Sequence, residues 1–167
     1  MYKKLISEQK DTLLRLSSLP FTQRTASANA ANWLASSLIK AIVGPRRAGK
    51  SRFALRLLQN TNFAYFNFED DRLNLASFDS DLFLQEISLV YRHPAYYFFD
   101  EIQNVPNWEI WINRLHRNGL NLIVTGSNSR LLSGELASAL TGRHIPIEIL
   151  PFSFSEYQRA LPSPSLD

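Results

Sequence analysis

One eight-residue segment constrains this chain more than any other, and it reads Gly44-Pro45-Arg46-Arg47-Ala48-Gly49-Lys50-Ser51. It follows the apolar run 39–43 and precedes a helix-like stretch at 53–58. A strand, a glycine-containing loop and a helix in this order are the context in which the pattern G-x-x-x-x-G-K-S binds phosphate. Backbone N–H groups of the loop and of the helix start then form a concave site for anions. The alternative is an ordinary strand-to-helix turn, and a second motif counts against it.

Two side chains of the loop have predicted tasks of their own. Lys50 can reach the β- and γ-phosphate oxygens of a nucleotide, and the hydroxyl of Ser51 can ligate Mg²⁺. We expect the nucleotide-binding segment to extend one residue further, so that it consists of Gly44, Pro45, Arg46, Arg47, Ala48, Gly49, Lys50, Ser51 and Arg52.

The second motif is an apolar, β-prone run that ends in two acids, Tyr96-Tyr97-Phe98-Phe99-Asp100-Glu101. A strand that is apolar on both faces is expected in the middle of a parallel sheet, with helices on each side. Ligands of such sheets lie at the carboxyl ends of the strands. Asp100 can therefore hold Mg²⁺, directly or through water, and Glu101 can orient and polarise an attacking water. The alternative is that both acids solubilise the strand end and cap the next helix.

Size and composition favour a single globular α/β domain. The chain has 167 residues, of which 45% are hydrophobic and 20% charged, as is typical of a globular protein with a sizeable core. It has no cysteine, which excludes disulfides and thiolate metal sites. No apolar run approaches the ~20 residues of a membrane span, and we expect a cytoplasmic protein. The net charge of +3 comes from scattered basic residues, which permits contact with nucleic acid but does not argue for it.

Strand and helix patterns alternate along the chain, which indicates βαβ units and a parallel sheet. Strands are expected at 39–43, 63–68, 96–99, 120–124 and 145–150, and helices at 6–16, 30–38, 53–58, 83–91, 108–115 and 131–140. We divide the chain into an N-terminal helical extension (1–38), a P-loop core (39–158) and a tail or linker start (159–167).

Further motifs complete a set that resembles the AAA-superfamily P-loop ATPases of bacteria and archaea, and most of all a STAND-like prokaryotic group. The set comprises G-P-R at 44–46, D-E-I-Q at 100–103, T-G-S at 125–127, G-R at 142–143 and the segment 151–157. The resemblance implies a three-layer fold whose five-stranded parallel sheet has the order 5-1-4-3-2. It also implies ATP as the nucleotide, with Mg²⁺ as the metal.

The same resemblance suggests two further site residues. The turn after the fourth strand lies between the P-loop strand and the acidic strand, so Ser127, or else Asn128, is expected to contact the γ-phosphate or the catalytic water. A helix N-cap is the alternative for either residue. Arg143 resembles the arginine of the G-R motif, which approaches the nucleotide from the same or a neighbouring subunit and stabilises transition-state charge. We favour action within one chain, and a surface ion pair is the alternative.

Members of the family continue into a helical region and a C-terminal domain of unknown function, whereas this sequence stops after 152–157. The expectation is the ATPase half of a longer protein or a truncated product, with the output domain or a partner protein missing. A monomer and a homo-oligomer both stay open.

Three functions fit the motifs to different degrees. The first is an ATPase with slow basal hydrolysis, in which Lys50, Ser51, Asp100 and Glu101 do the chemistry. The second is a nucleotide-dependent switch with little turnover, in a DNA-associated or defence-type system. The third, a P-loop kinase, lacks a recognisable acceptor site and an arginine-rich lid. Release of phosphate distinguishes the first two functions.

Overall fold

The structure is a computed structural model, and it describes residues 2–17, 20–126, 140 and 142–161. Its main elements in chain order are α1 (Lys3–Ser17), α2 (Ala30–Ala35), β1 (Ile39–Val43), α3 (Lys50–Leu58), β2 (Phe63–Asn67), α4 (Ser80–Val90), β3 (Tyr96–Asp100), α5 (Trp108–Arg117), β4 (Leu122–Thr125), β5 (His144–Glu148) and α8 (Phe154–Ala160). Short 3-10 turns lie at Thr25–Asn29, Leu75–Ser77 and Ile102–Asn104. The expected helix at 131–140 lies almost wholly outside the described residues.

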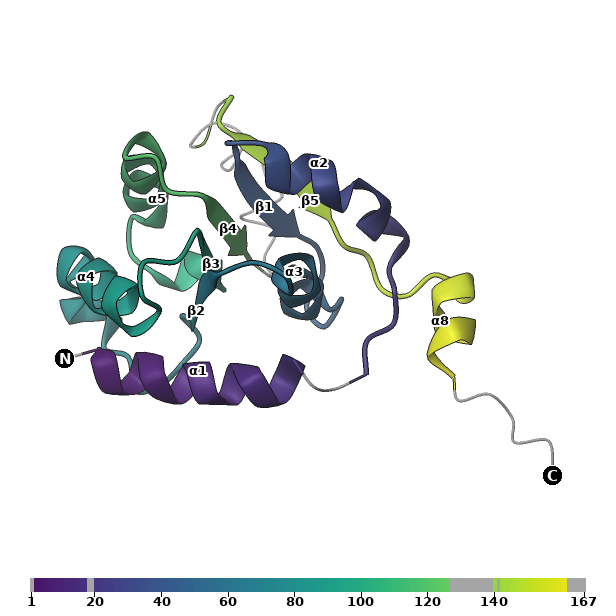
Figure 1. The fold of residues 1–167 in the computed structure, drawn as a ribbon, viewed down its shortest axis with the longest axis horizontal. Helices are drawn as coiled ribbons and strands as arrows, with labels where there is room; N and C mark the ends of the chain where they lie inside the picture. Colours follow the sequence, from purple (N-terminus) through teal and green to yellow (C-terminus); the bar gives the residue numbers. More distant parts are fainter. Residues whose placement is uncertain (1, 18–19, 127–139, 141, 162–167) are drawn as a thin grey trace.

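The five strands form one parallel sheet in the order β2-β3-β4-β1-β5 (Figure 1). This is the order 5-1-4-3-2 counted from the other edge, so the expected topology is confirmed. Every residue of β1 is buried, as a central strand of a parallel sheet requires. Because all strands run the same way, their carboxyl ends lie together at one end of the sheet. Residues 44–51 follow β1 there, and Glu101 follows β3.

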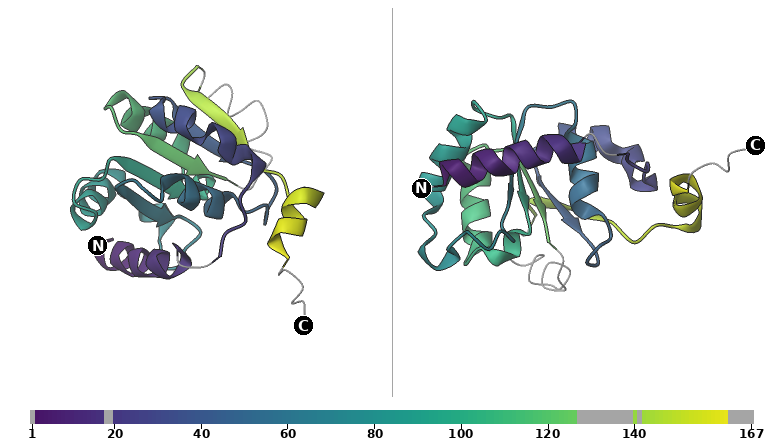
Figure 2. Two further views of the ribbon diagram at one scale, coloured as in Figure 1. Left: turned by 45° about the vertical axis from the view of Figure 1, so that its right-hand side comes forward. Right: turned by 90° about the horizontal axis from the view of Figure 1, so that it is seen from below.

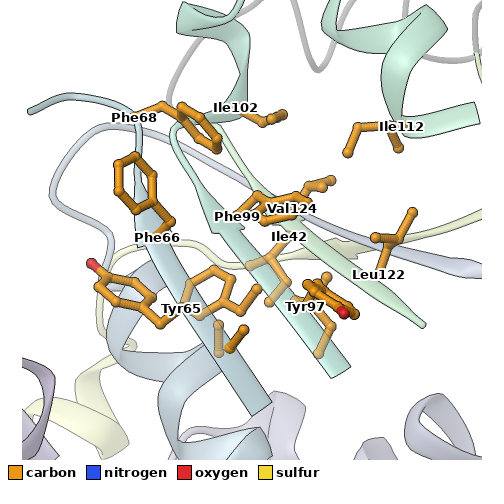
Figure 3. Packing of buried hydrophobic residues seen from close by; sticks show 14 of the residues in the cluster. Ile42, Tyr65, Phe66, Phe68, Tyr97, Phe99, Ile102, Ile112, Leu122 and Val124 are labelled. Carbon is orange, nitrogen blue, oxygen red and sulfur yellow. The ribbon is translucent and has the colours of Figure 1, made fainter. Parts of the chain in front are cut away.

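Helices cover both faces of the sheet. In Figure 2, α4 and α5 lie on one side and α2 and α3 on the other, while α8 lies far from α4 and α5. The core on the α4–α5 side is aromatic. Phe99 of β3 stacks on Trp111 of α5 with ring centroids 5.1 Å apart, and Phe83 of α4 meets Phe66 of β2 edge to face at 4.8 Å. Figure 3 shows Phe66, Phe68 and Phe99 within this packing. Such pairs add to the stabilisation that burial of the rings provides.

The edge strand β2 is protected by α1. The side-chain amide of Gln9 accepts the backbone N–H of Asn67 at 2.8 Å and donates to the backbone carbonyl of the same residue at 3.1 Å. Gln9 is buried, so a side chain satisfies backbone groups that a neighbouring strand would otherwise pair.

Helix boundaries differ from expectation where a cap decides them. The helix expected at 83–91 begins at Ser80 because the Asp79 carboxylate accepts the N–H groups of Asp81 and Leu82, both at 3.0 Å. The helix expected at 30–38 ends at Ala35.

None of the helices in the described part of the chain has the length and apolar composition that a membrane crossing requires.

Candidate functional site

The loop between β1 and α3 depends on two glycines with positive φ. Gly44 has φ 145° and Gly49 has φ 87°, values that residues with a side chain rarely adopt. At Gly44 a Cβ would also lie 2.1 Å from the backbone oxygen of Ile149. The loop therefore passes so close to the chain after β5 that only glycine fits at its first position.

Lys50 begins α3 and folds back over the loop. Its Nζ donates to the carbonyl oxygens of Gly44 at 3.1 Å and Pro45 at 2.9 Å, and the side chain is buried. Burial lowers the pKa of the ammonium group, while the nearby carboxylates of Glu101 and Asp100 act in the opposite direction. The ammonium group of Lys50 thus lies buried beside the backbone of the loop. A phosphate that binds there can replace the two neutral carbonyl oxygens as its hydrogen-bond acceptor.

Asp100 ends β3 and is the buried acid of the site, with 3% of its surface exposed. Three hydroxyl groups donate to its carboxylate: Ser51 at 2.9 Å, Tyr65 at 3.3 Å and Thr125. Burial raises the pKa of Asp100, and the charge of Glu101 adds to this, whereas the hydroxyl donors lower it. A buried carboxylate with neutral partners is a group that a cation would stabilise.

The donor set at this place fits Mg²⁺. The Ser51 hydroxyl and the Asp100 carboxylate are in hydrogen-bond contact, and oxygen ligands of this kind are those that Mg²⁺ prefers. Among the described residues, no group of three or more His, Cys, Asp or Glu side chains is arranged so that it could hold a metal ion. A cation here would therefore keep water or phosphate oxygens as its other ligands, which is usual for Mg²⁺.

Glu101 is held in a fixed position beside Asp100. It adopts left-handed backbone angles, φ 54° and ψ 46°, which are uncommon for a residue with a side chain and occur often at functional sites. Its N–H donates to Thr125 Oγ1 at 3.1 Å, and its carboxylate accepts the Gln103 amide at 2.6 Å. Thr125 therefore contacts both acids, through the backbone of one and the side chain of the other.

The arginines of the predicted segment have different surroundings. Arg46 forms an exposed ion pair with Glu69 at 3.1 Å, and Arg47 is exposed with φ 64°. The guanidinium of Arg52 donates to carbonyls at the end of α1 and in the segment that follows it. Arg46 thus pairs with a residue after β2, and Arg52 donates to the N-terminal part of the chain.

Arg143 lies at the amino end of the strands, whereas the loop lies at their carboxyl end. It directly precedes β5, whose first residue, His144, pairs with Ile39 at the start of β1, while Glu148 pairs with Val43 at the loop end. Five residues of parallel strand span about 17 Å, more than an arginine side chain can bridge. The expectation that Arg143 reaches the nucleotide of its own chain is therefore corrected, because the start of a parallel strand and the loop lie at opposite ends of the strands.

Ser127 and Asn128, the predicted sensor residues, lie outside the described residues. The residue of the T-G-S motif that the structure places against Asp100 is its first, Thr125. Sequence reasoning missed this residue although the motif contained it. Tyr65 was also missed, since a tyrosine within a β-prone run gives no sign of what its hydroxyl contacts.

Arg24 and Glu156 were missed as well, and they form a buried ion pair at 3.3 Å next to the loop. The only sequence signal was the S-x-x-E pattern of Ser153 and Glu156, which is typical of a capping box, and the structure has that box at the start of α8. A hollow of about 380 Å³ opens beside Arg24, with Phe21 and Phe152 among the residues in its wall.

The Arg24–Glu156 pair predicts how stability depends on pH. Burial alone would raise the pKa of Glu156, but backbone N–H donors and the Arg24 guanidinium outweigh it and lower the pKa to about 2 from 4.5. A lowered folded-state pKa contributes stability that is present above pH 4.5 and is lost as the pH falls toward 2. We expect Glu156→Gln to cost about 1–3 kcal/mol at neutral pH, and urea denaturation should show this difference shrinking by pH 3. A difference that stays constant with pH would contradict the assigned cause.

Comparison with known proteins places the chain among related sequences. A family model described as an AAA domain matches residues 36–158. An uncharacterized protein of Methanocaldococcus jannaschii is 43% identical over 122 residues, which cover 71% of this chain and 28% of that protein. A second uncharacterized protein, from Haemophilus influenzae, is 35% identical over 136 residues, which cover 75% of this chain and 34% of that protein. The chain therefore spans about a third or less of the length of these two relatives.

Solved structures share the fold at low sequence identity. The replication initiator DnaA, bound to AMPPCP and single-stranded DNA, has a TM-score of 0.50 and 16% identity, over 77% of this chain and 48% of that chain. RIF2 from Saccharomyces cerevisiae has a TM-score of 0.50 and 15% identity, over 100% of this chain and 72% of that chain. At such identities the likeness concerns the arrangement of helices and strands.

Proposed function

The chain belongs to the family of AAA domains, within the AAA superfamily of P-loop ATPases, and from this premise we propose that it binds ATP with Mg²⁺ at residues 44–51 and hydrolyses it slowly. The observation that carries the proposal is the contact between Ser51 and Asp100 at 2.9 Å. It joins two motifs that lie 49 residues apart in the sequence, and both supply the oxygen ligands that the chemistry needs.

Binding of the phosphates is the task of the loop and of Lys50. The Nζ of Lys50 now contacts two neutral carbonyl oxygens, and charged phosphate oxygens are stronger partners for an ammonium group. We therefore propose that Lys50 turns from the carbonyls of its own loop to the β- and γ-phosphates when ATP binds.

Hydrolysis is the task of the two acids. Ser51 and Asp100 would hold Mg²⁺, which when bound offsets the negative charge of the phosphates. Glu101 would orient the attacking water and accept its proton. The hydrogen bonds from Glu101 to Thr125 and from Gln103 to Glu101 support this role, because they fix the backbone and the carboxylate of the base.

Two parts of the proposal concern other molecules. Arg143 contributing to hydrolysis in a neighbouring copy of the chain stays a prediction, as does the homo-oligomer that it needs. We also propose that the protein acts in the cytoplasm. A C-terminal output domain or a partner protein would respond to the binding and hydrolysis of the nucleotide.

Lys50→Ala tests the binding step. We expect the affinity for Mg-ATP to fall at least about tenfold, or about 1.4 kcal/mol, because the charge-assisted contact with phosphate is lost. Isothermal titration calorimetry with and without Mg²⁺ measures it, and Lys4→Ala is the control because it removes an equal charge at an exposed position. Unchanged affinity in a folded Lys50→Ala variant would refute the site.

A nucleotide-dependent switch with little turnover is the second candidate function. Two contacts favour it because they connect the loop to the chain after β5. Gly44 lies against Ile149, and Arg24 donates to both Ala48 and Leu150. A parent protein that binds Mg-ATP and releases no phosphate at steady state would establish the switch and exclude the ATPase.

A further inference from the structure

Arg24 joins three segments of the chain through one guanidinium group, and only 6% of the residue surface is exposed. Its Nη1 donates to the carbonyl oxygen of Ala48 in the phosphate-binding loop at 2.9 Å, and its Nη2 donates to the carbonyl oxygen of Leu150 after β5. Its Nε lies 3.3 Å from the carboxylate of Glu156 in α8. The guanidinium also stacks over the ring of Phe152 at 4.8 Å. The planar fork of arginine suits such a set of fixed acceptors.

Glu156 is fixed from two further directions. Its Oε1 accepts the N–H of Thr25 at 2.8 Å, and its Oε2 accepts the N–H of Ser153 at 2.9 Å. One carboxylate thus binds the N-terminal segment and the start of α8 at once. Both members of the ion pair are less than a tenth exposed, so removal of one leaves the other charge buried without its partner, which is costly.

The contact with Ala48 fixes one peptide of the phosphate-binding loop. The C=O and the following N–H of a trans peptide point in opposite directions. While Arg24 holds the Ala48 carbonyl, the N–H of Gly49 is therefore directed away from Arg24. Gly49 has φ 87°, and a Cβ placed there would lie 3.5 Å from Arg24 Nη1. The guanidinium thus holds the peptide between Ala48 and Gly49, one residue ahead of Lys50.

A second contact links the loop to the same downstream segment. The N–H of Ile149 donates to the carbonyl of Val43 at 2.8 Å, and Gly44 packs directly against the Ile149 carbonyl. The chain after β5 therefore touches both ends of the loop, through backbone contact at Gly44 and through Arg24 at Ala48. A change in the shape of the loop has a direct route to residues 149–161.

We propose that Arg24 is a positioning residue for the phosphate-binding loop and that, together with Glu156, it couples nucleotide binding to the position of residues 149–161. This inference rests on the proposed function, because it needs the loop to bind ATP. Coupling of this kind is reciprocal: a partner that moves residues 149–161 changes the affinity of the loop for nucleotide by the same factor.

Hydrogen exchange and calorimetry on the whole chain test the coupling, with and without Mg-ATP. The variants are Arg24→Gln and Glu156→Gln, and Arg114→Gln is the matched control because it breaks an exposed ion pair with Asp81 on the other side of the sheet. In the parent and the control, ATP is expected to slow amide exchange in residues 153–161. In Arg24→Gln this protection should disappear and the affinity for ATP should fall about tenfold. Glu156→Gln should also lose the protection, with a smaller loss of affinity, because Glu156 does not touch the loop.

A purely structural role for Arg24 would lower the melting temperature but leave ATP affinity and the ATP-dependent protection of the folded variant intact, and that result would overturn the proposal. If Arg24→Gln does not fold, Arg24→Lys provides the test, because an ammonium group keeps the charge and cannot hold the three acceptors as a fork. A parent that binds ATP without protecting residues 153–161 overturns the coupling alone. A parent that binds no ATP overturns the proposed function, and this inference falls with it.

Discussion

Glu101→Gln is expected to bind Mg-ATP about as tightly as the parent and to hydrolyse it at least about a hundredfold more slowly. The amide keeps the shape of the side chain and can still accept the Gln103 hydrogen bond, but it cannot take a proton from water. The backbone contact between Glu101 and Thr125 does not involve the substituted group. Calorimetry measures the affinity, and single-turnover phosphate release with excess protein measures the rate.

Glu109→Gln is the control for this variant, since it makes the same change in the first turn of α5, outside the phosphate-binding loop and the pair of acids that follows β3. It should hydrolyse ATP at the parental rate. If Glu101→Gln also kept the parental rate, activation of water would belong to another residue. Glu101 would then serve only to begin the 3-10 turn Ile102–Asn104.

Gly44→Ala is expected to destabilise the protein by about 3 kcal/mol or more, since it combines a collision with an unfavourable φ. The new Cβ would lie 2.1 Å from the oxygen and 3.0 Å from the carbon of the Ile149 carbonyl. Backbone atoms on both sides must move, because no flexible side chain is there to give way. The melting temperature should fall by about 10 °C, and the displaced loop should also bind ATP more weakly.

Gly119→Ala separates the two causes. Gly119 also has a positive φ, 82°, but a Cβ there meets nothing within 4 Å. Its cost should therefore be that of the backbone conformation alone, about 1 kcal/mol. Equal losses of stability in the two variants would show that contact with Ile149 contributes nothing.

The parts of the fold that local patterns encode were predicted well. The approximate positions of the strands and the place of the P-loop follow from apolar runs and glycines that lie close together in sequence, and the structure confirms them. The strand order was implied by the family resemblance, and the structure confirms it too. The start of α4 was missed because Asp79 caps it ahead of the apolar stripe. The cap bonds N–H groups two and three residues further along the chain, before the first apolar residue of the stripe. Apolar periodicity alone therefore places the start of the helix too late.

The parts of the site that depend on distant contacts were not predictable in this way. Arg24 and Glu156 lie 132 positions apart in the chain, and neither belongs to a pattern that points to the other. Thr125 was inside a recognised motif, but only the pairing of β3 with β4 shows which hydroxyl faces Asp100. The placement of Arg143 could have been foreseen, because a residue before a parallel strand lies at the end of the strands opposite the loop.

The hydrogen bonds of Gln9 bear on how this domain could be shortened for experiments. The family match begins at residue 36, and a fragment cut there would lose Gln9 and with it the partner of both backbone groups of Asn67. An open strand edge is a template on which a strand of another molecule can add. A fragment that begins at the family boundary would thus be prone to self-association. In the whole chain, α1 covers the exposed edge of β2 and prevents a strand of another molecule from pairing with it.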